Sequence, residues 1–268
     1  MMSARMSTLV TLRGRIERLE THDGAYATGR VALGHEEVDS ALQGGLALGA
    51  VHEVFAEGSR HSAGATGFVL GLTARALRQR PLLWIAADFG EREMGALSMS
   101  GLSELGLDPR CLVTVRASDV ESALRTAADA LACDALGAVV LEVWGETRHL
   151  NLVTSRKLTL AAQASRVTGF VLRMAATPQA STAETRWIVR AAHSPPAASS
   201  MPAAPWSAWG APVFDAQLVR NRHGPIGRWT MEWKCDECLF TEPAADPQPV
   251  AATPAHRPHQ AFQRRRTG

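Results

Sequence analysis

Lysine is almost missing from this 268-residue chain, in which only Lys157 and Lys234 occur. The phosphate-binding loop of nucleoside triphosphatases has the form GxxxxGK[ST], and its lysine carries positive charge to the β and γ phosphates. Both lysines lie in the second half of the chain, so no Gly-rich segment of the first half can supply that residue. A complete phosphate-binding loop of this kind is therefore excluded.

Cysteines and long apolar runs are also scarce. The four cysteines show no spacing typical of a disulfide framework, and they are Cys111, Cys133, Cys235 and Cys238. No stretch approaches the roughly 18 continuous apolar residues of a membrane helix, and residues 1–20 lack the apolar segment of a secretory signal. We therefore expect a reduced, cytoplasmic protein without a membrane partner.

Positive charge is not in general excess. The formal net charge is +2 at pH 7, and residues 241–268 account for it with four arginines against two carboxylates. The rest of the chain is neutral overall, so nucleic-acid binding would need a local basic patch.

Several sequence motifs of catalytic, cofactor-binding and metal-binding sites are absent as well. The chain has no hydrolase nucleophile elbow, no dinucleotide-binding fingerprint and no paired zinc motif. The segment CDEC, Cys235 to Cys238, has the spacing of half a zinc site, but no second pair accompanies it. We expect no metal centre.

The chain does contain alternating apolar runs and amphipathic segments typical of parallel βαβ units. The expected core strands are Gly49–Ala56, Leu82–Ala87, a short strand ending near Val115, Gly137–Val143 and Gly169–Met174. The expected helices are His35–Leu42, Thr66–Gln79 with Thr66 as its N-cap, one within residues 95–107, Glu121–Ala132 and Leu150–Arg166. Together they predict an α/β fold, a mostly parallel sheet flanked by helices.

The two ends of the chain differ from this pattern. Residues 1–30 are expected to form a helical arm and linker, because Leu9, Leu12, Ile16 and Leu19 share one helical face. Trp187–Ala192 is strand-like, and Val213–Arg220 with Arg228–Trp233 predicts a hairpin that closes the sheet. The α/β domain then covers residues 31–240, and the Pro- and Ala-rich residues 241–268 are expected to be disordered.

The Gly-rich segment after the first core strand is the main candidate site. It contains Gly58, Gly64, Ala65, Thr66 and Gly67, which could cradle a phosphate through backbone N–H groups even without a lysine. Glu142 ends a core strand where Mg²⁺ of a nucleotide would be held, and Asp88 follows another strand where a carboxylate could activate water. The alternative is that this segment retains the shape of a phosphate-binding loop but no longer binds a ligand.

Other residues suggest contacts with partners. Arg220, Arg222 and Arg228 surround the predicted hairpin turn and could hold nucleic-acid phosphates or an acidic protein. Trp206 and Trp209 lie in a Pro/Ala-rich segment, where docking on a partner is more plausible than core packing. Trp229 and Trp233 share one face of their strand and are expected in the core.

The ordered combination of these segments resembles a known family. LGHEEVDSALQGGLALGAVHEVFA is similar to the start of the RecA-type ATPase core, with Asp39 on a helix before Gly44-Gly45. Over residues 9–240, the chain resembles the ImuA family of SOS-inducible, RecA-like mutagenesis proteins, which are also similar to the cell-division inhibitor SulA. The segments that carry this resemblance include ATGFVLGLTARAL, GAVVLEVWG, LTLAAQASRVTGFVLRM, AETRWIVRAA and LVRNRHGPIGRWTMEW.

The resemblance implies a RecA-like fold and an accessory role in damage-induced translesion DNA synthesis. Implied partners are ImuB, which is an inactive relative of Y-family polymerases, RecA itself and an error-prone replicative-type polymerase subunit; single-stranded DNA is a further possible ligand. Residues 175–184 occupy the place of a RecA DNA-binding loop but carry no Lys or Arg.

The leading hypothesis is a RecA-fold adaptor in a translesion complex that is non-catalytic or binds nucleotide weakly. The alternatives are a DNA-stimulated ATPase that binds ATP and Mg²⁺ through an atypical loop, and a SulA-like inhibitor of cell division.

Overall fold

A nine-stranded sheet forms the centre of the protein in the computed structural model, which describes residues 29–194 and 210–243. The strand order is β11-β10-β9-β8-β3-β7-β6-β4-β5. Neighbouring strands from β8 to β5 are parallel, whereas β9, β10 and β11 extend the sheet in antiparallel pairing. The expected α/β fold with a mostly parallel sheet is confirmed.

The strands of the sheet are β3 (Val51–Ala56), β4 (Leu82–Ala87), β5 (Leu112–Ala117), β6 (Ala138–Trp144), β7 (Thr168–Met174), β8 (Thr185–Ala191), β9 (Val213–Asn221), β10 (Gly227–Lys234) and β11 (Leu239–Thr241). A separate two-stranded sheet pairs β1 (Arg30–Val31) with β2 (Leu46–Ala47). The helices are α2 (Glu36–Ala41), α3 (Ser62–Ala76), α4 (Asp88–Met94), α5 (Met99–Glu104), α6 (Val120–Leu131) and α7 (Leu152–Ser165).

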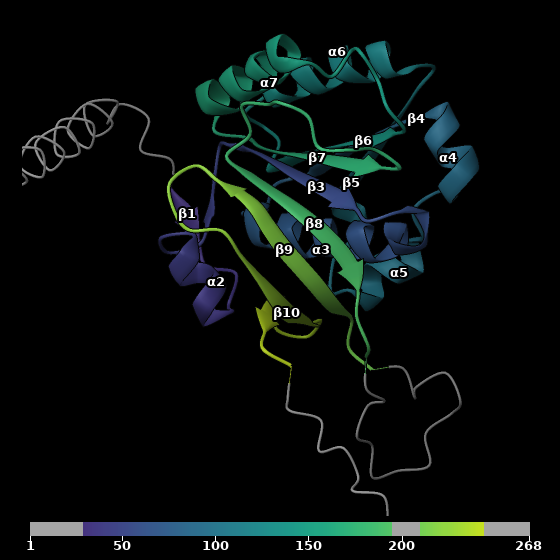
Figure 1. Cartoon of the computed structure of the whole chain (residues 1–268). Coiled ribbons are helices and arrows are strands. Elements are labelled where there is room, and N and C mark those ends of the chain that lie inside the picture. Colours follow the sequence, from purple (N-terminus) through teal and green to yellow (C-terminus); the bar gives the residue numbers. More distant parts are fainter. Residues whose placement is uncertain (1–28, 195–209, 244–268) are drawn as a thin grey trace, which may run out of the picture.

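Helices cover both faces of the sheet, as continuous apolar strands require. Alternate residues of β4 and β6 belong to two separate core clusters, one facing α3 and one facing α6 and α7. Figure 1 shows α6 and α7 on one side of the sheet and α3 and α5 on the other. The chain therefore has two hydrophobic cores separated by the sheet. None of the helices in the described ranges combines the length and apolarity needed to span a bilayer.

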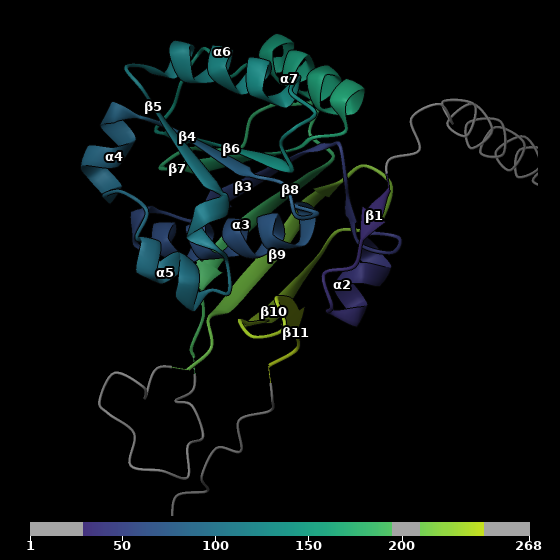
Figure 2. The same cartoon turned by 180° about the vertical axis from the view of Figure 1, so that it is seen from behind.

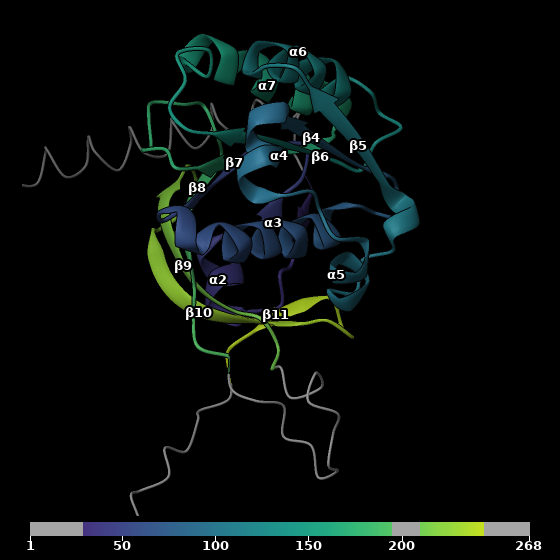
Figure 3. The same ribbon diagram turned by 90° about the vertical axis from the view of Figure 1, so that its right-hand side faces the viewer.

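The antiparallel end of the sheet curls around α3, so that strands border this helix on more than one side (Figure 3). Glycines of α3 make this close approach possible. A Cβ atom at Gly64 would lie 3.1 Å from the Ala191 backbone nitrogen, and one at Gly71 would lie 2.6 Å from Phe240 Cζ. Seen from behind, β10 and β11 lie below α3 with α2 beside them (Figure 2).

Several boundaries differ from the sequence-based expectations. Helix α3 begins at Ser62, so Thr66 lies inside the helix and its expected role as N-cap is wrong. The predicted hairpin of β9 and β10 is present, with β11 as an additional strand. Strands β1 and β2 were not expected, because two residues carry no periodic signal.

Asp39 has a structural role in this fold. Its carboxylate accepts the backbone N–H groups of Leu33 at 2.7 Å and Gly34 at 2.9 Å. Short helix α2 is thereby tied to the segment that follows β1.

A buried hydrogen-bond network joins β2, β3 and β8. Trp187 Nε1–H donates to Thr185 Oγ1 at 3.1 Å, and that hydroxyl lies 2.8 Å from His52 Nδ1. His52 Nε2 lies 2.8 Å from the Ala47 carbonyl, which can only accept, so Nε2 carries the proton. When His52 is neutral, every donor and acceptor of this hydrogen-bond network has a partner. Burial lowers the pKa of His52 to about 4.

This histidine predicts a pH-dependent stability. In the unfolded chain His52 binds a proton below about pH 6.5, whereas in the folded chain it stays neutral down to about pH 4. Because the unfolded state binds more protons in this window, the free energy of unfolding falls by about 3 kcal/mol as the pH drops from 7 to 4. Urea unfolding at each pH measures the loss. His52→Gln keeps a donor and an acceptor without titrating, so an equally steep pH dependence in that variant would contradict the prediction.

The glycine face of α3 predicts opposite effects for two substitutions. Gly71→Ala should lower the free energy of unfolding by about 1–2 kcal/mol, because its methyl group overpacks against Phe240 and Trp233 despite better helix propensity. Gly67→Ala meets only Phe214 at 3.5 Å and should stabilise by up to about 1 kcal/mol. Urea titrations followed by circular dichroism compare the two; stabilisation by both would show that α3 is not tightly enclosed.

Candidate functional site

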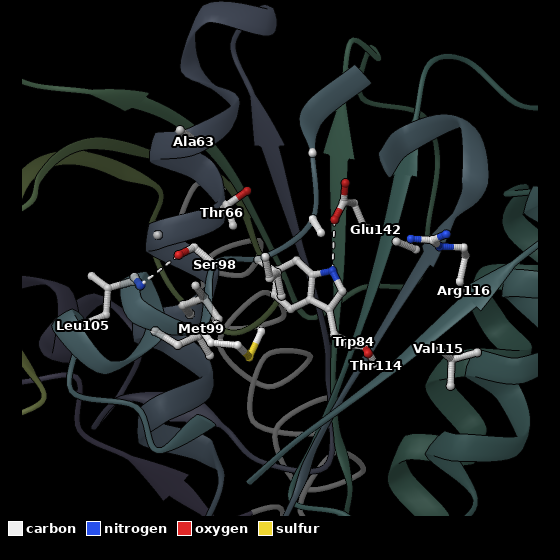
Figure 4. Close-up of a pocket in the computed structure, with 18 residues that line it drawn as sticks. Ala63, Thr66, Trp84, Ser98, Met99, Leu105, Thr114, Val115, Arg116 and Glu142 are labelled. Carbon is white, nitrogen blue, oxygen red and sulfur yellow. Dashed lines mark hydrogen bonds between the residues drawn. The ribbon is translucent and has the colours of Figure 1, made fainter. Parts of the chain in front are cut away.

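A cavity of about 720 Å³ lies between α3, α5 and strands β4, β5 and β6. One face of α3 lines it through Ala63, Thr66, Gly67 and Leu70, which follow helical spacing. The remaining wall includes Trp84 of β4, Arg116 of β5 and Glu142 of β6 (Figure 4). Two of the predicted features, the Gly-rich segment and Glu142, therefore meet at one cavity.

The strand register explains why Glu142 and Arg116 both reach this space. Both residues pair laterally with Ala86, Glu142 from β6 and Arg116 from β5, so their side chains leave the same face of the sheet. Trp84, two residues earlier on β4, points to that face as well. Sequence alone did not identify Trp84 or Arg116, because no periodic signal gives the register between separate strands.

Trp84 holds the Glu142 carboxylate. Its indole Nε1–H donates to Glu142 Oε2 at 3.0 Å, a contact that Figure 4 marks in the cavity. Trp84 is 3% exposed and Glu142 is 9% exposed, so the bond lies at the inner end of the cavity. A hydrogen bond from a buried donor to a carboxylate fixes the orientation of both side chains.

Asp88 lies at the solvent side of the same region. It is the first residue of α4, directly after β4, and its carboxylate is 3.8 Å from the Arg116 guanidinium. Both side chains are substantially exposed, so this ion pair contributes little to stability. Asp88 thus has a cationic neighbour at the edge of the cavity.

The start of α3 is closed by contacts with β8. The turn runs through Gly58, with φ +77°, and a short 3-10 helix, Ser59–His61. His61 Nδ1 accepts the Ala191 backbone N–H at 3.2 Å, and Arg190 forms an ion pair with Glu57. Gly64 is required by the contact with Ala191, not by an open phosphate cradle. Gly64, Ala65, Thr66 and Gly67 lie within α3 and form no loop, contrary to expectation.

The start of α3 does not have the form of a phosphate-binding loop. The helix start provides no lysine, and its first turn packs on the sheet. Within the described ranges, no three His, Cys, Asp or Glu side chains gather as potential metal ligands. The arrangement can bind a mainly apolar group beside one carboxylate and one guanidinium.

The predicted hairpin residues are mostly engaged within the protein. Arg228 makes a bidentate contact with Asp215, and Arg220 donates to the Ser181 carbonyl at 2.7 Å. Arg222 is exposed near the turn. Trp233 is fully buried, as expected, and Trp229 is half-buried against Trp187.

Cys235 and Cys238 are free thiols in the turn between β10 and β11. Burial raises the pKa of Cys235, which disfavours the thiolate that metals bind. The arm residues Leu9, Leu12, Ile16 and Leu19, together with Trp206 and Trp209, lie outside the described residues.

Comparison of the chain with models of known protein families gives no match, and comparison with curated proteins gives none either. Function is therefore inferred from the site and from the resemblance in sequence.

The Trp84–Glu142 contact predicts a large stability effect. Trp84→Phe should lower the free energy of unfolding by about 2–3 kcal/mol, because it removes a buried hydrogen bond to a carboxylate and leaves part of the indole volume unfilled. Trp229→Phe is a matched control: its indole donates to Glu37 Oε2 at the same 3.0 Å, but the bond is exposed, so the cost should stay below about 1 kcal/mol. Equal losses in chemical denaturation would contradict the structural role of Glu142.

Proposed function

We propose that the protein is a RecA-like accessory factor of damage-induced translesion DNA synthesis that acts as an adaptor without hydrolysing ATP. The observation that carries the proposal is the closed start of α3, where Gly64 packs on Ala191 and His61 is bonded to β8. The parallel sheet that remains around this turn supports a RecA-like core, in keeping with the resemblance in sequence.

The loop at residues 175–184 also favours protein contact over DNA binding. The Glu146 carboxylate accepts the N–H and hydroxyl of Thr177 at 2.6 Å each, and the side-chain amide of Gln179 at 3.0 Å. Hydrogen bonds from Thr177 lower the pKa of Glu146, so a negative charge is fixed beneath the loop. The Arg173 guanidinium lies 3.9 Å from Glu146 and offsets part of this charge, so the support here is that the polar groups of the loop are engaged within the protein.

The proposed partners are those that the resemblance implies: an ImuB-like relative of Y-family polymerases, RecA and an error-prone replicative-type polymerase subunit. The amphipathic segment at residues 9–19 and the exposed Arg222 are the proposed contact points.

A DNA-stimulated ATPase is the second candidate, because Thr66 and Glu142 line one cavity of about 720 Å³. In this alternative, Glu142 would be the metal-binding carboxylate and the cavity would hold the nucleotide.

Phosphate-release assays with the full chain distinguish the two candidates. We expect no turnover of ATP above background, with or without single-stranded DNA, because no lysine neutralises the phosphates. Turnover that Glu142→Ala abolishes would contradict the adaptor proposal and support the enzyme.

The adaptor role is tested by co-purification with the three proposed partners. The double substitution Leu12→Asp and Ile16→Asp should reduce recovery of at least one partner by about tenfold or more, because it places charge on the apolar face of the arm. Arg13→Gln, on the polar face, is the control and should leave recovery unchanged. If the double substitution leaves the recovery of all three partners unchanged, the arm is not a contact with any of them.

A further inference from the structure

A second cavity, of about 410 Å³, lies on the opposite face of the sheet from the first, between α6 and α7 and beside residues 145–151. Figure 1 shows the two helices next to each other on that face. The cavity combines an apolar floor with a basic rim. Leu124, Ala128 and Leu158 form the floor, and the rim includes Glu121, Arg125, Arg148, His149 and Lys157.

The charges of the rim do not balance. Glu121 forms an ion pair with Arg125, one helical turn later on α6. In the part of the chain that the structure describes, the side chains of Arg148 and Lys157 have no ion pair or hydrogen bond. The only other lysine of the protein, Lys234, is paired with Glu232. Two like charges thus face one cavity without a carboxylate of their own.

The start of α7 adds to this positive field. Asn151 Oδ1 caps the helix by accepting the N–H groups of Val153 and Thr154 at 3.0 and 3.1 Å. The N-terminal end of a 14-residue helix carries partial positive charge, which favours an anion nearby. Asn151 and Thr154 also line the cavity.

We propose that this cavity binds the phosphate group of a nucleotide unit. Arg148 can contact two phosphate oxygens with its planar guanidinium, while Lys157 supplies a point charge from the facing helix. The floor formed by Leu124, Ala128 and Leu158 takes the less polar sugar or base. A volume of about 410 Å³ lies within the usual range of small-ligand pockets, roughly 300–1,000 Å³.

This phosphate can come from a free nucleotide or from single-stranded DNA, and both sources share the chemistry that the rim recognises. The site is independent of the proposed adaptor function, because it involves neither the first cavity nor the arm. Its failure would leave that proposal untouched.

The test uses the full chain and two probes. Isothermal titration calorimetry measures binding of deoxyadenosine diphosphate, and fluorescence anisotropy measures binding of a labelled single-stranded oligonucleotide. Replacing both cations, with Arg148→Gln and Lys157→Gln, should weaken binding by about a hundredfold, because each lost charge-assisted contact removes roughly a factor of ten. Glu121→Gln should tighten binding severalfold, because it removes the one carboxylate of the rim.

Arg156→Gln is the matched control, since Arg156 is exposed on α7 directly before Lys157 but does not line the cavity. It should change affinity by less than about twofold, and circular dichroism should show unchanged folding of every variant. Binding of the diphosphate alone supports a free nucleotide, and binding of the oligonucleotide, with or without the diphosphate, supports a DNA strand. Absence of binding by both probes at millimolar concentration, or equal weakening by Arg156→Gln, overturns the proposal.

Discussion

The contact between the glycines of α3 and the curled end of the sheet is the constraint on which the rest of the structure depends. Phe68 of α3 packs against Trp187, Phe214 and Phe240, with ring centroids 5.4–5.6 Å apart. These rings come from β8, β9 and β11, and the glycines of α3 leave room for that approach: Gly64 beside Ala191, Gly67 beside Phe214 and Gly71 beside Phe240. The curl joins the antiparallel extension to the parallel sheet and makes one core of both.

The same constraint decides what the Gly-rich segment does. A phosphate cradle needs backbone N–H groups that face open space, whereas here the first turn of α3 is pressed against β8. A different face of the helix, with Ala63, Thr66 and Leu70, borders the first cavity. One face of α3 therefore packs in the core, and another lines the first cavity. The cavity-lining face of the helix carries no cation that could bind a phosphate.

The alternation of strands and helices was predictable from sequence because β4, β6 and β7 are nearly continuous apolar runs. The start of α3 at Ser62 was not predictable, because several glycines lower the helix propensity of this segment. In the folded protein, tertiary packing overrides that low propensity. Glu142 could be found as the polar residue near a strand end. Its partner Trp84 depends on register across β4 and β6, which single-sequence periodicity does not contain. The Arg228–Asp215 ion pair could not be predicted from sequence for the same reason, since the two residues meet only across β9 and β10.

The near absence of lysine fits the way this protein uses positive charge. Arg186 is paired with Glu53 at 2.6 Å, and buried Arg173 donates to the Gly145 carbonyl at 3.1 Å, so both guanidiniums tie strands and loops together. Both also lie 5.6 Å from the ring centre of Phe55, a contact that planar arginine makes well. These two arginines therefore contribute their charge to contacts within the fold. Arg148, in the segment between β6 and α7, and Lys157 of α7 both line the second cavity, where they can contact a ligand without disturbing the sheet.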